Sequence, residues 1–158
     1  MKRHWIAGLF FPCVVLPGLA SGIVEIESIQ ARLFLGHSGS LSAPLTKKDA
    51  LFNTIVGGAE IDGVPLREPS ESTLVDVIVR GKPGAFDSLW TLDLVVTNRE
   101  TGEKIGAYEQ HAGVLGSDGR FHVAFLIPDT GCTPLHLLAK VRGTESKGEM
   151  NVDFVCRE

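Results

Sequence analysis

The chain has 158 residues, of which 44% are apolar and 22% are charged, with 18 Gly and 8 Pro. This composition indicates one globular domain and argues against collagen-like, coiled-coil and disordered chains. Lys and Arg total 15 against 19 for Asp and Glu, so the formal net charge is -4. An acidic chain has no general attraction for phosphate backbones, and nucleic acid is therefore not an expected partner.

The first twenty residues have the order of a secretory signal peptide. Lys2 and Arg3 precede an apolar run, and small residues close the segment at Gly18 and Ala20. The run is interrupted by prolines and is shorter than the about 20 apolar residues that a membrane-spanning helix needs. We expect residues 1–20 to be a cleaved signal and residues 21–158 to be a single exported domain, periplasmic or extracellular, without membrane insertion. A retained anchor and a lipid on Cys13 are the alternatives.

After the signal, apolar residues recur with a period of two, and turn residues interrupt them. Val75, Val77 and Val79, for example, alternate with Asp76 and Arg80, which predicts a strand with one buried face. The predicted strands are residues 24–35, 51–56, 73–80, 89–98, 104–111, 121–128, 134–142 and 150–156. A short helical turn is expected only at Lys47 to Asn53.

About eight short antiparallel strands predict an all-β fold, a two-sheet β-sandwich of immunoglobulin-like architecture. A strict immunoglobulin domain is not supported, because its Trp lies between two distant cysteines, whereas Trp90 precedes both Cys132 and Cys156. A transthyretin-like arrangement or a barrel is the alternative. The predicted core consists of Val75, Val77, Val79, Trp90, Leu92, Leu94, Phe121, Val123, Phe125, Leu137, Val152 and Phe154.

Two connections, Gly36 to Ala50 and Gly57 to Ser72, are longer than ordinary hairpin loops. If the strands simply alternate in direction, the first lies at the same end as the turns at 81–88, 112–120 and 143–149. The second then lies beside Asp129 to Cys132. Loops at one end of a rigid sandwich commonly form a binding site. The expected binding residues are Gly36, His37, Ser38, Ser40, His111 and Arg120.

Three short motifs suggest chemistry, and each has a simpler interpretation. Residues 36–40 resemble the nucleophile elbow G-x-S-x-G, but the fifth residue is Ser and Pro44 disfavours a following helix. Asp129-Thr130-Gly131 is similar to the aspartic-protease tripeptide and equally typical of a turn. Glu109 and His111 have a spacing that some metal sites use, but this spacing is not diagnostic. We therefore predict no catalytic residue, no resident metal and no cofactor.

The leading functional hypothesis is a secreted or periplasmic, non-enzymatic β-sandwich. It would bind another protein or an envelope component through end loops or an edge strand. One alternative is a small secreted hydrolase, similar to an aspartic protease, that uses Asp129. The other is a periplasmic inhibitor or immunity protein.

We predict a disulfide between Cys132 and Cys156, because both survive signal cleavage and export exposes them to an oxidising compartment. Closing a loop of about 25 residues should stabilise the fold by roughly 3.5 kcal/mol in the chain-entropy model. Residues that lie directly opposite each other in an antiparallel pair share one face of the sheet. If the apolar residues of the last two strands, such as Leu137 and Val152, share a face, the residue numbers of each opposed pair add up to an odd value. The numbers 132 and 156 add up to an even value. Cys132 should therefore lie outside the regular ladder, with a strand break at Pro134.

Non-reducing mass spectrometry of the exported protein should show a two-hydrogen deficit and a linked peptide pair. Two free thiols in freshly exported protein would refute the bridge.

Overall fold

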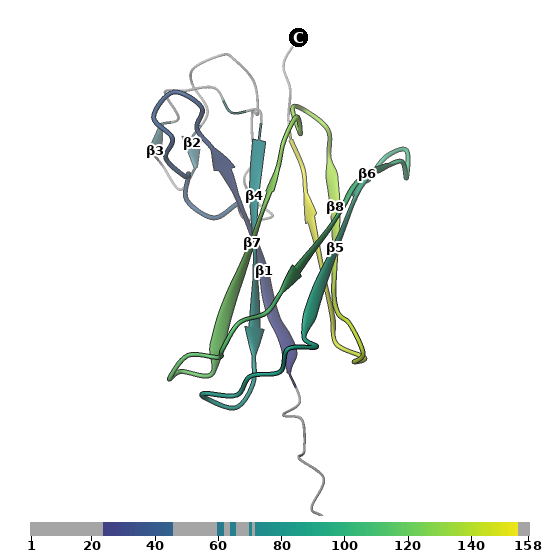
Figure 1. The fold of residues 1–158 in the computed structure, drawn as a ribbon. Coiled ribbons are helices and arrows are strands. Elements are labelled where there is room, and N and C mark those ends of the chain that lie inside the picture. Colours follow the sequence, from purple (N-terminus) through teal and green to yellow (C-terminus); the bar gives the residue numbers. More distant parts are fainter. Residues whose placement is uncertain (1–23, 46–59, 62–63, 66–69, 71, 155–158) are drawn as a thin grey trace, which may run out of the picture.

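The structure, a computed structural model, describes residues 24–45, 60–61, 64–65, 70 and 72–154. They form two antiparallel sheets arranged as two layers (Figure 1). The first has the order β1-β4-β7, with β1 at Glu25–Phe34, β4 at Ser72–Arg80 and β7 at Arg120–Ile127. The second has the order β6-β5-β8-β9, with β5 at Thr91–Asn98, β6 at Lys104–His111, β8 at Leu135–Val141 and β9 at Lys147–Val152. A small hairpin joins β2, Glu60–Ile61, to β3, Val64–Pro65.

The all-β prediction is confirmed, and the strands pair as two separate sheets rather than as one closed barrel within the described ranges. No helix in these ranges has the length and apolar character needed to cross a membrane. Strand β9 starts at Lys147 rather than at residue 150. The β2–β3 hairpin lies in the expected loop Gly57 to Ser72, and its two-residue strands are too short to show alternation. The predicted strand 51–56, the helical turn at 47–53 and the signal segment lie outside the described residues.

Strand β4 is the centre of the first sheet, and its alternation decides which side chains form the core. Val75, Val77 and Val79 are fully buried. Val77 lies opposite Ile29 of β1 and Val123 of β7. The residues on the buried face of the sheet therefore form rows that run across all three strands. These rows pack against the inward residues of the second sheet in one shared cluster. The two sheets therefore share a single hydrophobic core, as the sequence predicts.

The predicted core residues are buried except Phe121 and Phe154, which are half-buried and pack against the cluster. The cluster also contains Leu33, Leu115 and Leu135, which are fully buried and were not among the predicted residues. Leu115 lies in a loop, where no alternation marks it as a core residue.

The predicted position of the Gly36 loop is wrong. Phe34, at the end of β1, pairs with Ser72 at the start of β4. Thr73, which follows Ser72, pairs with Ile127 at the end of β7. The Gly36 loop therefore lies at the same end as the turn around Asp129. The prediction counted a strand at 51–56 between β1 and β4, which would make them run in the same direction. Instead, β1 and β4 are direct antiparallel neighbours, which reverses the end at which the loop emerges.

Cys132 lies in the turn between β7 and β8, and β8 begins only at Leu135, just after Pro134. The predicted strand break is therefore confirmed. Leu137 faces Met150 in the β8–β9 pair, the odd-sum register that the sequence predicts. Cys156 lies outside the described residues, so the bridge itself stays a prediction.

The orientation of β7 can be tested with two neighbouring residues. Phe125 is 5% exposed and Leu126 is 48% exposed. Phe125→Ala should lower the free energy of unfolding by about 3 to 5 kcal/mol, and Leu126→Ala should change it by less than about 0.5 kcal/mol. Urea denaturation measures both values. Equal losses, or a larger loss for Leu126→Ala, would mean that β7 faces the other way.

Candidate functional site

Two loops are joined at the end of the molecule opposite the Gly36 loop. One connects β4 to β5 and the other connects β6 to β7. Four backbone hydrogen bonds of 2.9 to 3.0 Å link them, from Gly81 N to Gly119 O, Gly84 N to Leu115 O, Leu115 N to Ala85 O, and Ala112 N to Trp90 O. Trp90 and Leu115 are buried and anchor the loops in the core. The hydrogen bonds and the two buried side chains therefore hold these loops together at one end of the two sheets.

Local sequence explains this geometry. Asp87 organises the first loop, because its Oδ1 accepts a hydrogen bond from Leu89 N at 2.9 Å and its carbonyl accepts one from Trp90 N. Gly119 permits the close approach of the second loop. It has φ of +76°, and a Cβ there would lie 2.5 Å from the carbonyl oxygen of Gly81. Only glycine satisfies both conditions without strain.

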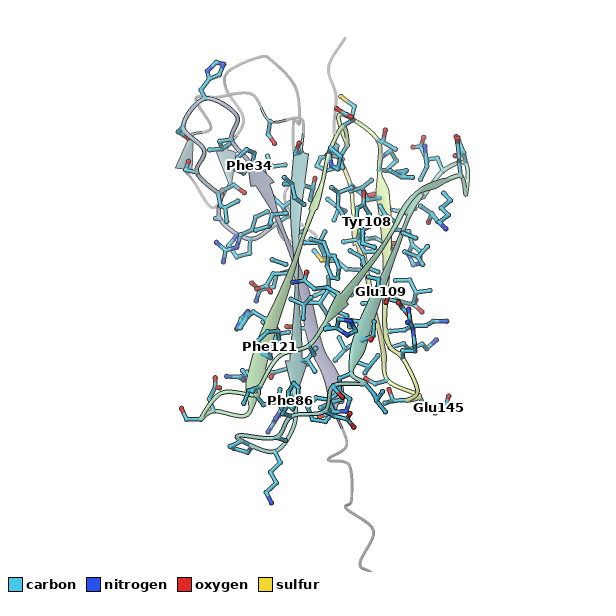
Figure 2. All side chains as sticks on the ribbon, in the orientation of Figure 1. Phe34, Phe86, Tyr108, Glu109, Phe121 and Glu145 are labelled. Carbon is cyan, nitrogen blue, oxygen red and sulfur yellow. The ribbon has the colours of Figure 1, made fainter. Side chains whose placement is uncertain are left out.

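Three large apolar side chains project from these loops into solvent. Phe86 is 60% exposed, Leu89 is 77% exposed and Val114 is 58% exposed. We call these three residues the apolar tip. Figure 2 places Phe86 at the same end as Glu145 of the β8–β9 turn and at the opposite end from Phe34. Large apolar side chains held in solvent by a rigid scaffold are typical of interaction surfaces.

The predicted binding residues do not lie together. His111 ends β6 and Arg120 begins β7, so both flank the loop that carries Val114. The loop with Gly36, His37, Ser38 and Ser40 lies at the other end. It closes on itself through hydrogen bonds from Leu35 N to Ser40 O and from Gly39 N to Leu35 O. The hydroxyls of Ser38 and Ser40 lie 2.7 Å apart.

Arg120, the first residue of β7, forms an ion pair with Glu27 of β1. Its Nε and Nη2 donate to the two carboxylate oxygens of Glu27 at 2.7 and 2.5 Å. This hydrogen bonding holds the pKa of Glu27 below its ordinary value and raises that of Arg120. The pair joins β1 to β7 across the outer face of the first sheet. The carboxylate of Glu27 balances the positive charge of Arg120.

The Asp-Thr-Gly segment forms the β7–β8 turn. Asp129 has φ of +51° and an exposed side chain, and Thr130 is buried with its hydroxyl 3.0 Å from that of Thr73. This is the geometry of a turn anchored by its threonine. The tripeptide therefore lies at the end opposite the apolar tip.

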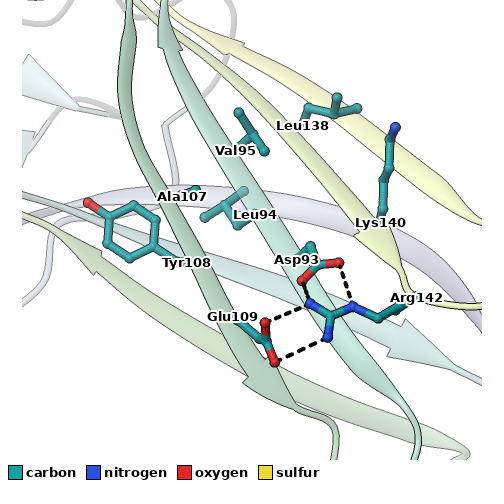
Figure 3. Close-up of a pocket in the computed structure, with 9 residues that line it drawn as sticks. All are labelled: Asp93, Leu94, Val95, Ala107, Tyr108, Glu109, Leu138, Lys140 and Arg142. Carbon is teal, nitrogen blue, oxygen red and sulfur yellow. Dashed lines mark hydrogen bonds and ion pairs between the residues drawn. The ribbon is translucent and has the colours of Figure 1, made fainter.

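A hollow of about 410 Å³ lies on the four-stranded sheet (Figure 3). Arg142 spans its lower part, donating to Asp93 at 2.6 and 3.2 Å and to Glu109 at 2.6 and 3.3 Å. These hydrogen bonds raise the pKa of Arg142, first through Glu109 and then through Asp93. With Lys140 also in the lining, the two carboxylates and two cations balance. The hollow therefore favours no ionic ligand, and the apolar tip is the stronger candidate.

Glu109 and His111, the sequence candidates for a metal site, have separate partners. Glu109 accepts from Arg142, and Nδ1 of His111 lies 3.1 Å from the Thr91 hydroxyl. Among the residues that the structure describes, no three His, Cys, Asp or Glu side chains lie close enough to hold a metal ion.

No family model matches the chain, and no curated protein is detectably similar to it in sequence. The apolar tip is therefore a candidate site on its geometry alone. The sequence pattern did not reveal the apolar tip, because it predicts only a turn at residues 81–88 and the start of a strand at residue 89. Phe86 and Leu89 nevertheless indicate an exposed apolar surface in the sequence itself. They flank Asp87 and Ser88, and large apolar residues at such positions are unusual in a solvated turn.

The joining of the two loops can be tested at Gly119, with Gly143 as a matched control. Both have positive φ, +76° and +78°, but a Cβ at Gly143 would meet nothing within 4 Å. Gly143→Ala should cost about 1 to 2 kcal/mol of stability from backbone strain alone. Gly119→Ala should cost clearly more and should speed amide exchange at Gly84 and Leu115. Equal losses for the two variants would contradict the close approach.

Proposed function

We propose that this chain is a secreted or periplasmic, non-enzymatic β-sandwich that binds another protein or an envelope component. The observation that carries the proposal is the apolar tip, because three large apolar side chains are kept in solvent on loops that four backbone hydrogen bonds hold rigid. A rigid apolar surface loses little conformational entropy on binding. The bound partner would be a protein surface with an apolar recess.

The strand order supports an immunoglobulin-like description of the sandwich. If the seven long strands are called A, B, C, C′, E, F and G, one sheet is A-B-E and the other is C′-C-F-G. Immunoglobulin variable domains likewise carry C′ beside C, and they bind through the B–C and F–G loops at one end. In this chain the B–C loop carries Phe86 and Leu89. The proposed surface thus uses the end of the fold that such domains commonly use.

Export is the second part of the proposal and rests on the N-terminal signal pattern alone. Lys2 and Arg3, the apolar run and the small residues at Gly18 and Ala20 support it. The partner should accordingly be sought among envelope or extracellular components.

The test is affinity capture from an envelope extract of cells that make the protein, followed by affinity measurement with the purified partner. The double variant Phe86→Ser/Leu89→Ser should weaken binding by about tenfold or more, because exposed anchors dominate such interfaces. Leu41→Ser is the matched control, since Leu41 is 43% exposed at the opposite end. It should bind like the wild type.

Binding that survives Phe86→Ser/Leu89→Ser would contradict the proposal. Hydrolysis of a peptide or ester panel by the purified protein, lost in Asp129→Asn, would favour the hydrolase alternative.

A further inference from the structure

The hollow on the four-stranded sheet lies on the outer face of that sheet, away from the core. Leu92, Leu94 and Val96 of β5 are buried and belong to the core. Asp93 and Val95 alternate with them and therefore point outward into the hollow. The volume of about 410 Å³ is within the range of about 300 to 1,000 Å³ that is typical of small-molecule sites. The residues that line the hollow do not include the apolar tip, so the two sites are separate.

One row of side chains across this face is apolar. Val95 lies opposite Ala107 of β6 and Leu138 of β8. Ala107 is exposed, and Val95 and Leu138 are half-buried. In Figure 3 this row lies above the ion pairs of Arg142. The upper part of the hollow therefore offers an apolar surface that a ligand can reach.

The next row is charged, and Arg142 fixes its geometry. Asp93 lies directly opposite Glu109, and two like charges in this position repel each other. The guanidinium of Arg142 offsets the repulsion, because it donates to both oxygens of each carboxylate. The side chains of Asp93, Arg142 and Glu109 are 34%, 52% and 53% exposed. The carboxylates are therefore held in place and remain accessible from solvent.

The polar atoms of this row favour a ligand with hydroxyl groups. Each of the four carboxylate oxygens accepts one hydrogen bond from Arg142 and keeps a second lone pair. Lys140, which lies opposite Asp93, adds ammonium donors. The hollow thus offers acceptors and donors together, while its charges balance. A hydroxyl matches this combination, because it is neutral and both donates and accepts through one oxygen.

Other classes of ligand fit the hollow less well. An apolar ligand would remove the two carboxylates from water without replacing their hydrogen bonds, which costs free energy. A ligand with a net charge would meet a like charge as well as an opposite one. An extended peptide adds to a sheet through free backbone groups at an edge, whereas β5 and β8 lie inside the sheet and pair on both sides.

We propose that this hollow binds a neutral saccharide. Its hydroxyls would bond to the carboxylates of Asp93 and Glu109 and to the ammonium group of Lys140. The C–H face of the sugar ring would lie on the apolar row centred on Val95, where its burial removes apolar surface from water. A sugar ring combines hydroxyls and an apolar face in one neutral molecule, which is the combination that the two neighbouring rows present.

The experiment incubates the purified full chain with an array of immobilised neutral, anionic and cationic saccharides. The chain should bind neutral saccharides, and titration calorimetry with one of these in solution measures the affinity. Glu109→Ala should weaken binding by about tenfold or more, because two hydrogen-bond acceptors are lost. Glu149→Ala is the matched control, since Glu149 is 51% exposed on β9 of the same sheet and pairs with Lys147. It does not line the hollow and should bind like the wild type.

A second variant tests the apolar row and leaves the ion pairs intact. Ala107→Gln should also weaken binding, because the longer side chain covers this row. Ala124→Gln is its control, since Ala124 is an exposed alanine on β7 of the other sheet. Circular dichroism checks that all the variants are folded.

Three results would overturn the proposal: no neutral saccharide binds the wild type, charged saccharides bind it more tightly, or binding survives both Glu109→Ala and Ala107→Gln. Phe86→Ser/Leu89→Ser should bind the saccharide normally, and a loss of binding in this variant would also contradict the assignment to the hollow. A failure of the apolar tip and a failure of the hollow are thereby distinguishable.

Discussion

The pairing of β4 with β1 on one side and β7 on the other is the constraint on which the rest of the structure depends. It places three valines of β4 at the centre of one sheet, where they are fully buried. Because side chains alternate across a strand, a shift of one residue would bring Asp76 and Ile78 inward and expel the valines. The same register brings Gly81, which follows β4, to Gly119, which precedes β7, and so positions the two loops that carry the apolar tip.

The apolar tip arises from the loop end of this arrangement. At the loop end, the buried side chains of Trp90 and Leu115 anchor the two loops in the core, whereas Phe86, Leu89 and Val114 are exposed. This surface offers apolar side chains on loops that backbone hydrogen bonds hold in place.

The strands and most of the core could be predicted, because alternation is a local property. Val75, Val77 and Val79, or Leu92 and Leu94, display it within a few residues of sequence. The placement of the Gly36 loop depends instead on whether β1 meets β4 directly, a long-range pairing that no local pattern records. The apolar tip was missed for a similar reason. Phe86 is exposed because its loop is hydrogen-bonded to a segment that lies far along the chain, around Leu115.

The central claim is that the loop end with Phe86 contacts a protein partner. Photo-crosslinking tests it most directly, with a benzophenone amino acid at position 86 in one variant and at position 41, at the opposite end, in another. In cells that export the protein, the position-86 variant should crosslink to one discrete protein, and the position-41 variant should not. Crosslinking of that protein from position 41, or no product from position 86, would contradict the account.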